Sequence, residues 1–156
     1  MKKFLLFPLL VFMTALVVPA CSDDDKDEFA NNDKTEETTK YNGTLIVNGH
    51  YKKENTDCEI IFDEQKEKLT MTIFQVKFAE NMPLTLDISL QGIPCNATNE
   101  MTTFSGNDIV PMMGEVPVPA YTFSNIEGSI KDDTDLIFSA TLTKGTFTFN
   151  GKKVVE

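Results

Sequence analysis

The chain has 156 residues, with 24 Asp and Glu against 14 lysines and no arginine, and its formal net charge is −10. An acidic chain without the guanidinium fork is a poor match for nucleic acid and for bidentate binding of phosphate or carboxylate groups, so we expect no nucleic-acid partner. The charge suits a soluble domain in an exposed setting.

The N-terminus has the parts of a bacterial lipoprotein signal peptide. Lys2 and Lys3 precede an apolar run from Phe4 to Val18, and small residues lead to Cys21. The run has the length of a secretory h-region and is too short for a spanning helix. We therefore expect cleavage after residue 20 and lipidation of Cys21, whose several acyl chains would anchor the protein stably. The other interpretation is an ordinary signal peptide followed by a chance cysteine.

Residues 21–40 have the composition of a disordered, acidic tether, because they combine dense charge with few apolar side chains. The segment Ser22-Asp23-Asp24-Asp25 resembles the surface-export signal of lipoproteins from gut Gram-negative bacteria. This resemblance implies an outer-membrane protein on the cell surface. A spacer facing the periplasm is the alternative.

From residue 41 to 156 the pattern predicts one all-β domain. Apolar and polar residues alternate over 84–90, 136–142 and 146–149, and again over 57–63. Such alternation is typical of antiparallel strands with one buried face. In the run 69–78 the apolar phase slips between Ile73 and Phe74, which predicts a β-bulge. Strand breaks are expected at 81–83, 91–94, 131–133 and 144–145.

About eight short strands with short connections favour a single antiparallel eight-stranded meander barrel, with a β-sandwich as the alternative. At this point residues 41–156 resemble the calycin-like domain family of secreted bacterial lipoproteins. The resemblance rests on Tyr41-Asn42-Gly43-Thr44, Met82-Pro83-Leu84, Thr102-Thr103-Phe104-Ser105-Gly106, the proline-rich turn 111–119 and Gly128-Ser129-Ile130. It implies a barrel related in shape to lipocalins, although the Gly-x-Trp signature of true lipocalins is missing because the chain has no tryptophan.

Two cysteines remain in the domain once Cys21 is lipidated. Cys58 and Cys95 would meet oxidising conditions in an exported protein, so a disulfide between them is one interpretation. Two separate small apolar side chains are the other, since Cys58 lies on the apolar face of its strand. The sequence leaves both open.

The sequence offers little for catalysis, and we expect no enzyme, no catalytic residue, no cofactor and no metal site. His50 is the only histidine and has no second ligand at metal-binding spacing. Asp132, Asp133 and Asp135 are clustered and could serve a hydrolase only if they converged in a cleft. Their place between two strands favours a turn.

The segment 109–121 is the most unusual part of the domain, because it carries three prolines between apolar residues. Three prolines cannot all lie in a central strand, so we expect a connection over one barrel end. Met112, Met113, Val116 and Tyr121 could line a ligand mouth there, or they could cap the core. We thus expect a non-catalytic binding module for a small apolar ligand, or alternatively a packed barrel that binds an envelope protein or a glycan.

Overall fold

The computed structural model of the protein describes residues 37–143 and 145–155. The predicted signal peptide, the lipidation site Cys21 and most of the predicted tether lie outside these residues. The described chain is all β apart from one 3₁₀ turn, Pro119–Tyr121. The strands are β1 (Thr38–Val47), β2 (Tyr51–Phe62), β3 (Lys68–Val76), β4 (Leu86–Ala97), β5 (Met101–Gly106), β6 (Met112–Met113), β7 (Val116–Pro117), β8 (Phe123–Lys131), β9 (Asp135–Leu142) and β10 (Gly145–Lys153). Among the described residues no helix is long and apolar enough to cross a membrane.

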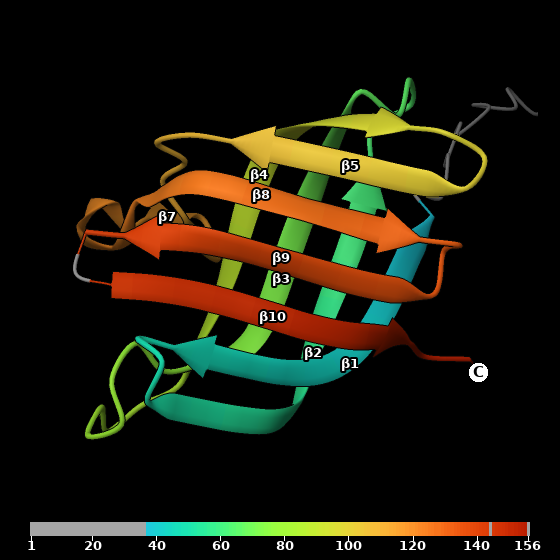
Figure 1. The fold of residues 1–156 in the computed structure, drawn as a ribbon. Coiled ribbons are helices and arrows are strands. Elements are labelled where there is room, and N and C mark those ends of the chain that lie inside the picture. The colour runs from blue at the N-terminus through green and yellow to red at the C-terminus, as the bar shows by residue number, and fades with distance from the viewer. Residues whose placement is uncertain (1–36, 144, 156) are drawn as a thin grey trace, which may run out of the picture. The chain divides into compact units, whose positions relative to one another are not determined.

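Eight of these strands close into an antiparallel meander barrel, as the sequence predicted. Each pairs with the next along the chain, except that β8 follows β5, and the first strand β1 pairs with the last strand β10. Pairing of β3 with β4 continues the ring, so the alternative of an open sandwich is wrong. Figure 1 shows β5, β8, β9 and β10 in front, with β2, β3 and β4 crossing behind them.

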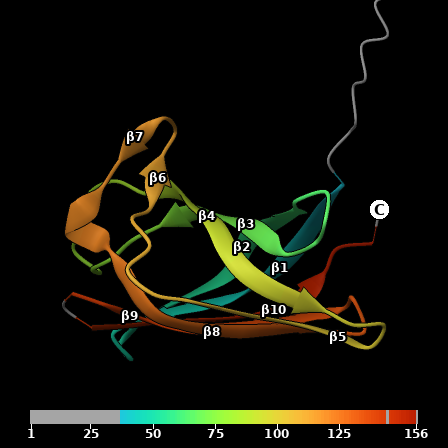
Figure 2. The ribbon, with the colours of Figure 1, turned by 90° about the horizontal axis from the view of Figure 1, so that it is seen from above.

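The short strands β6 and β7 form a hairpin that is attached to the barrel rather than part of its ring. Met112 of β6 pairs with Ser89 in the first half of β4, whereas the second half of β4 pairs with β5 at Cys95, Asn96 and Ala97. The neighbours β4 and β5 therefore share only three pairs. The hairpin fills the space that opens between them, and it projects from one end of the barrel in Figure 2.

The interior of the barrel is filled by side chains. A connected set of aromatic rings runs through it: Tyr121 on Phe78, Phe78 beside Phe123 and Phe147, Phe147 beside Phe138, and Phe138 beside Phe149. The Phe78 and Tyr121 centroids lie 4.0 Å apart, and those of the other pairs lie 5.8 to 6.4 Å apart, within the usual range for paired aromatic side chains. Leu45, Ile60, Met71, Ile88 and Leu90 are fully buried around them. An eight-stranded barrel is just wide enough to be filled in this way.

A bulge lies in β3 next to the predicted position. Ile73 pairs with Ile88 and Val76 with Leu86, so three steps on β3 face two on β4. Gln75 adopts a left-handed backbone with φ of 54°. Its N–H donates to Asp87 Oδ1 at 2.8 Å and its carbonyl accepts from Lys53 Nζ at 2.9 Å. The bulge returns Val76 to the buried face.

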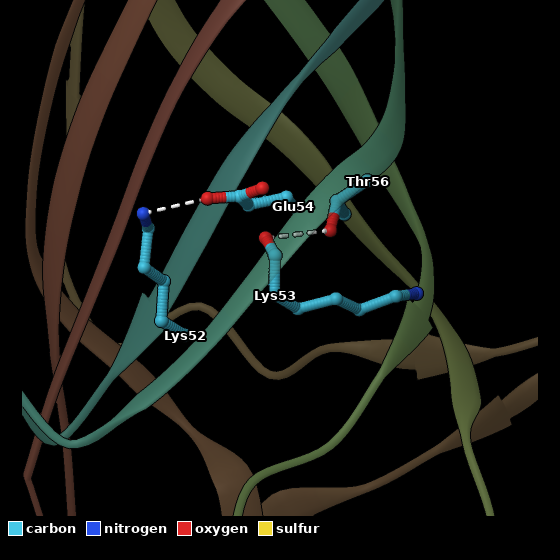
Figure 3. A network of polar contacts seen from close by, with 4 residues as sticks. All are labelled: Lys52, Lys53, Glu54 and Thr56. Carbon is cyan, nitrogen blue, oxygen red and sulfur yellow. Dashed lines mark hydrogen bonds and ion pairs between the residues drawn. The ribbon is translucent and has the colours of Figure 1, made fainter.

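A second irregularity bends β2 opposite Thr44 of β1. Gly43 pairs with Thr56 but Leu45 with Lys53, and Asn55 has a φ of 53°. Figure 3 shows the local contacts: Thr56 Oγ1 donates to the Lys53 carbonyl at 3.3 Å, and Lys52 Nζ pairs with Glu54 at 2.7 Å. β2 remains paired with β1 on both sides of this bend, and its pairing with β3 begins after the bend, at Cys58.

Three expected boundaries differ from the structure. β1 begins at Thr38, three residues before the predicted domain start, because Thr38 and Thr39 pair with Ile61 and Ile60. The predicted break at 91–94 is a bulge inside a continuous β4, where Gly92 has a φ of 69°. Leu84, expected on a buried strand face, precedes β4 and is 70% exposed.

Candidate functional site

The two ends of the barrel differ in chemistry. The end at which β1 begins and β10 finishes carries the tight turns β2 to β3, β4 to β5 and β8 to β9, which are rich in charged residues. The other end, called here the loop end, carries the turn 48–50, the loop 77–85, the segment 107–122 and the β9 to β10 turn. Figure 2 shows the C-terminus at the first end and the β6–β7 hairpin at the loop end. Long apolar loops thus gather away from the point where the described chain starts.

A groove of about 590 Å³ opens at the loop end, and we refer to it as the loop-end groove. Its apolar walls are Phe78, Met82, Pro83, Tyr121 and Leu142, and Asn48, Asn81 and Thr143 add polar groups. This volume is in the range of small-molecule sites. An apolar lining with a few polar groups is also typical of such sites.

An aromatic pair separates the groove from the core. The rings of Phe78 and Tyr121 are stacked, with centroids 4.0 Å apart and planes within 8°. Phe78 is 7% exposed and contacts Phe123 and Phe147 on its inner side. Tyr121 is held in the 3₁₀ turn, where its N–H donates to the Val118 carbonyl at 3.1 Å. The stack closes this end of the barrel. A ligand in the groove would therefore contact the outer side of the stack and would not enter the barrel.

The polar side chains of the groove differ in whether they already make hydrogen bonds within the protein. Asn48 is part of the barrel, because its Oδ1 accepts from the Thr146 N–H at 3.2 Å and its backbone N–H donates to the Thr146 carbonyl at 2.8 Å. The side chains of Asn81 and Thr143 make no hydrogen bond with the described part of the chain. They are available to a polar group of a ligand, and neither carries a charge.

Of the residues predicted to line a mouth, Tyr121 alone borders this groove. Met112 is half-buried in β6 beside Ser89, whereas Met113 and Val116 pair with each other near the tip of the hairpin and are 38% and 60% exposed. The prediction placed all four in one connection over the barrel end. The structure separates them, because Met112 to Pro117 form a two-stranded hairpin with Gly114 in its turn.

The two domain cysteines are free thiols, so the disulfide interpretation is not supported. Cys58 is fully buried opposite Ile73 of β3, whereas the N–H of Cys95 donates to the carbonyl of Glu67. Cys95 thus lies beside residue 67 and Cys58 beside residue 73, and these two positions are about 20 Å apart in extended chain. An S–S bond cannot span that distance. Burial raises the pKa of both thiols, with Glu59 adding to the effect at Cys58 and Asp63 at Cys95.

The clustered aspartates do not converge. Asp132 and Asp133 are exposed in the β8 to β9 turn with φ of 48° and 54°, and Asp135 pairs with Lys152 at 3.1 Å. Hydrogen bonding from Lys152 lowers the pKa of Asp135. His50 is exposed in the turn between β1 and β2. In residues 37–143 and 145–155 no group of three His, Cys, Asp or Glu side chains is arranged to hold a metal ion. The geometry therefore gives no support to the hydrolase interpretation.

Comparisons with known proteins add no relative: no family model, no curated protein and no solved structure matches the chain. The resemblance to calycin-like lipoproteins thus remains a prediction from short motifs, beside a barrel that is observed.

Sequence reasoning missed most of the loop-end groove. Phe78, Met82 and Leu142 were assigned to strands or breaks, and their meeting with Tyr121 depends on which loops share a barrel end. One signal was present. In an eight-stranded meander barrel the first, third, fifth and seventh connections lie at the same end. The apolar residues of these connections can therefore be grouped from strand order alone.

Proposed function

We propose that this chain is a lipid-anchored, non-catalytic binding module of the outer bacterial surface that takes a small apolar ligand in the loop-end groove. The observation that carries the proposal is the division between a filled barrel and a groove above the Phe78–Tyr121 stack. Ligand binding inside the barrel, as in lipocalins, has no room among the buried aromatic rings. Membership of the calycin-like family is part of the same proposal.

The lining of the groove favours an uncharged, largely apolar ligand. Met82 is flexible and adapts to varied apolar shapes, while the stacked Phe78 and Tyr121 offer a rigid, flat floor. Asn81 and Thr143 could accept one neutral polar group of the ligand. No cation lines the groove among the residues that the structure describes, so a carboxylate or phosphate would gain no ion pair from them.

The groove also has a suitable position for an anchored protein. The described chain starts at the opposite end of the barrel, so a tether from Cys21 to Glu37 would leave the loop end accessible to ligands in the medium. A cell-surface location therefore fits this geometry, and attachment facing the periplasm is the alternative.

Binding can be tested with the neutral apolar fluorophore N-phenyl-1-naphthylamine on the full mature chain. We expect a saturable rise in fluorescence with the wild type. Ala79→Trp should weaken the affinity at least tenfold, because the indole would fill the groove that Ala79 lines. The matched control is Met113→Trp, which adds the same ring on the exposed hairpin at the same barrel end. Equal binding by both variants, or none by the wild type, would contradict the proposal.

A further inference from the structure

A second hollow lies on the outer surface of the barrel, and it shares no lining residue with the loop-end groove. This outer-face depression spans β1, β10, β9 and β8 and has a volume of about 850 Å³. It is formed by side chains that point away from the core, because they alternate with buried residues on all four strands. These strands lie side by side in the front layer of Figure 1.

Strand register arranges these side chains in two rows across the sheet. One row runs from Thr44 through Asn150 and Ile137 to Ser129, and the next from Ile46 through Thr148 and Ser139 to Glu127. Adjacent strands are about 5 Å apart, so each step along a row is about the length of one sugar ring. The rows hold five hydroxyl or amide side chains, two isoleucines and one carboxylate.

The polar side chains of these rows are not engaged by the protein. Within the described residues, Thr44, Thr148, Ser139, Ser129 and Asn150 make no side-chain hydrogen bond. Each hydroxyl can donate and accept, and the amide does both through different atoms. Ile137 lies among them and is 51% exposed. Hydroxyls beside an exposed apolar group match a ligand that itself alternates hydroxyl and C–H surfaces.

Three glycines at inward-facing positions lie in the sheet beneath the depression, and none of them has room for a Cβ. A Cβ on Gly128 would lie 2.2 Å from the Phe104 ring, and a Cβ on Gly151 would lie 2.6 Å from the Phe149 ring. Gly43 faces Gly151 across the β1–β10 pair, where a Cβ would lie 2.2 Å from the Asn150 carbonyl oxygen. Core rings thus require glycine at 128 and 151, and the backbone of β10 requires it at 43, so the sheet beneath the depression is closely packed from within.

Charge favours a neutral ligand. Lys152 at the rim is already paired with Asp135, and Glu127 is the remaining charged side chain that lines the depression. An anionic ligand would meet the Glu127 carboxylate, and the described lining holds no unpaired cation to offset it. A carboxylate does accept hydrogen bonds from neutral hydroxyl groups, and such charge-assisted bonds are stronger than neutral ones.

The same surface is a poor match for a protein or peptide. Strand addition needs a free edge, whereas β1, β10, β9 and β8 are paired on both sides. Protein interfaces concentrate binding energy in Trp, Tyr and Arg, and the outward side chains of the two rows include none of these. We propose that the outer-face depression is a binding site for a neutral oligosaccharide laid across β1, β10, β9 and β8.

NMR titration of the isotope-labelled full mature chain tests this proposal. The probes are the neutral hexasaccharides of cellulose, mannan and amylose, with hexagalacturonic acid as the anionic counterpart of equal length. We expect at least one neutral probe to give saturable shifts centred on Asn150, Ile137 and Ser139, and the anionic probe to give none. A variant pair then separates contact from fold: Asn150→Ala should weaken binding at least fivefold, and Thr141→Val should not, because Thr141 lies on the same face of β9 outside the depression.

Several results would overturn the proposal. These are the absence of saturable shifts with all three neutral probes, shifts confined to the loop-end groove, or tighter binding of hexagalacturonic acid. Unchanged binding by Asn150→Ala in a chain with an unaltered spectrum would do the same. The wild-type shift map needs no variant, so it decides the question even if Asn150→Ala does not fold. The apolar ligand proposed for the loop-end groove is tested separately, by the fluorophore experiment.

Discussion

Lys53 Nζ donates a hydrogen bond to the backbone carbonyl of Gln75 at 2.9 Å, and it also lies 3.3 Å from the Gln75 side-chain oxygen. This contact joins the bend of β2 to the bulge of β3. Gln75 has a left-handed backbone that costs a residue with a Cβ about 1 kcal/mol or more. The ammonium group from β2 and the Asp87 carboxylate from β4 satisfy both polar groups of the Gln75 backbone.

Lys53→Met should therefore destabilise the protein by about 1 to 2 kcal/mol, because it retains most of the apolar stem and removes the charge-assisted bond to the bulge. Urea unfolding measures the change. Lys52→Met is the matched control: Lys52 pairs with Glu54 on the surface, and exposed ion pairs contribute little, so the expected loss is below about 0.5 kcal/mol. Equal losses in both variants would show that the bulge does not depend on Lys53.

Gly128→Ala should destabilise the barrel by about 1 to 3 kcal/mol, since the added methyl group would meet the Phe104 ring and the Phe138 Cβ in a filled interior. Thermal unfolding followed by circular dichroism measures this. Ser129→Ala, the next residue, points outward and should change the free energy of unfolding by less than about 0.5 kcal/mol. A Gly128→Ala variant as stable as the wild type would mean that the interior has spare room.

The cysteines should differ in reactivity. Cys58 is fully buried and its thiol pKa is raised, so it should resist iodoacetamide until the protein unfolds. Cys95 is partly exposed, and burial and Asp63 raise its pKa as well, so its alkylation in the folded protein should be slow at neutral pH and accelerate as the pH rises. Peptide mapping by mass spectrometry measures both. A Cys58–Cys95 linked peptide in the non-reduced protein would contradict the structure.

Alkaline pH should weaken the fold through Tyr41. Burial raises the pKa of its phenol from 10.0 to about 12, and the Asp133 carboxylate and Cys58 add to the effect. The unfolded chain loses this proton near pH 10 and the folded chain keeps it until about pH 12, so the stabilisation is complete below pH 10 and is lost as the pH rises through this window.

The check is a comparison of wild type with Tyr41→Phe, which lacks the titrating group. The difference in their free energies of unfolding should fall by about 1 kcal/mol between pH 9 and pH 11, as measured with urea at each pH. A difference that stays constant across this range would show that the buried phenol is not coupled to folding.

Much of the barrel was predictable from the sequence because alternation reports directly on burial. Leu136, Phe138 and Ala140 fix one face of β9, and the phase slip after Ile73 indicated the bulge that Gln75 makes. Leu84 was misplaced because it continues the apolar alternation of 86–90, although Pro83 precedes it and no partner strand reaches it. Alternation describes faces and does not say where a strand ends.

The candidate sites were less accessible to sequence reasoning. Tyr121 and Phe78 are 43 positions apart, and their stacking depends on the barrel being closed. The outer-face depression depends in the same way on register between four strands, none of which has an unusual motif. The hairpin 112–117 was hidden by the prolines of its segment, because a proline such as Pro117 is tolerated in a strand only at a sheet edge, which β7 occupies.

The central claim, a filled barrel that binds at its loop end, is tested most directly by methyl NMR of methionine-labelled protein. The five methionines of the domain report on different places: Met71 is in the interior, Met82 in the loop-end groove, Met112 and Met113 in the hairpin, and Met101 is exposed near the opposite end. On titration with N-phenyl-1-naphthylamine we expect the Met82 methyl signal to shift saturably, with Met71 and Met101 unchanged. A saturable shift of Met71 would place the ligand inside the barrel and contradict the account.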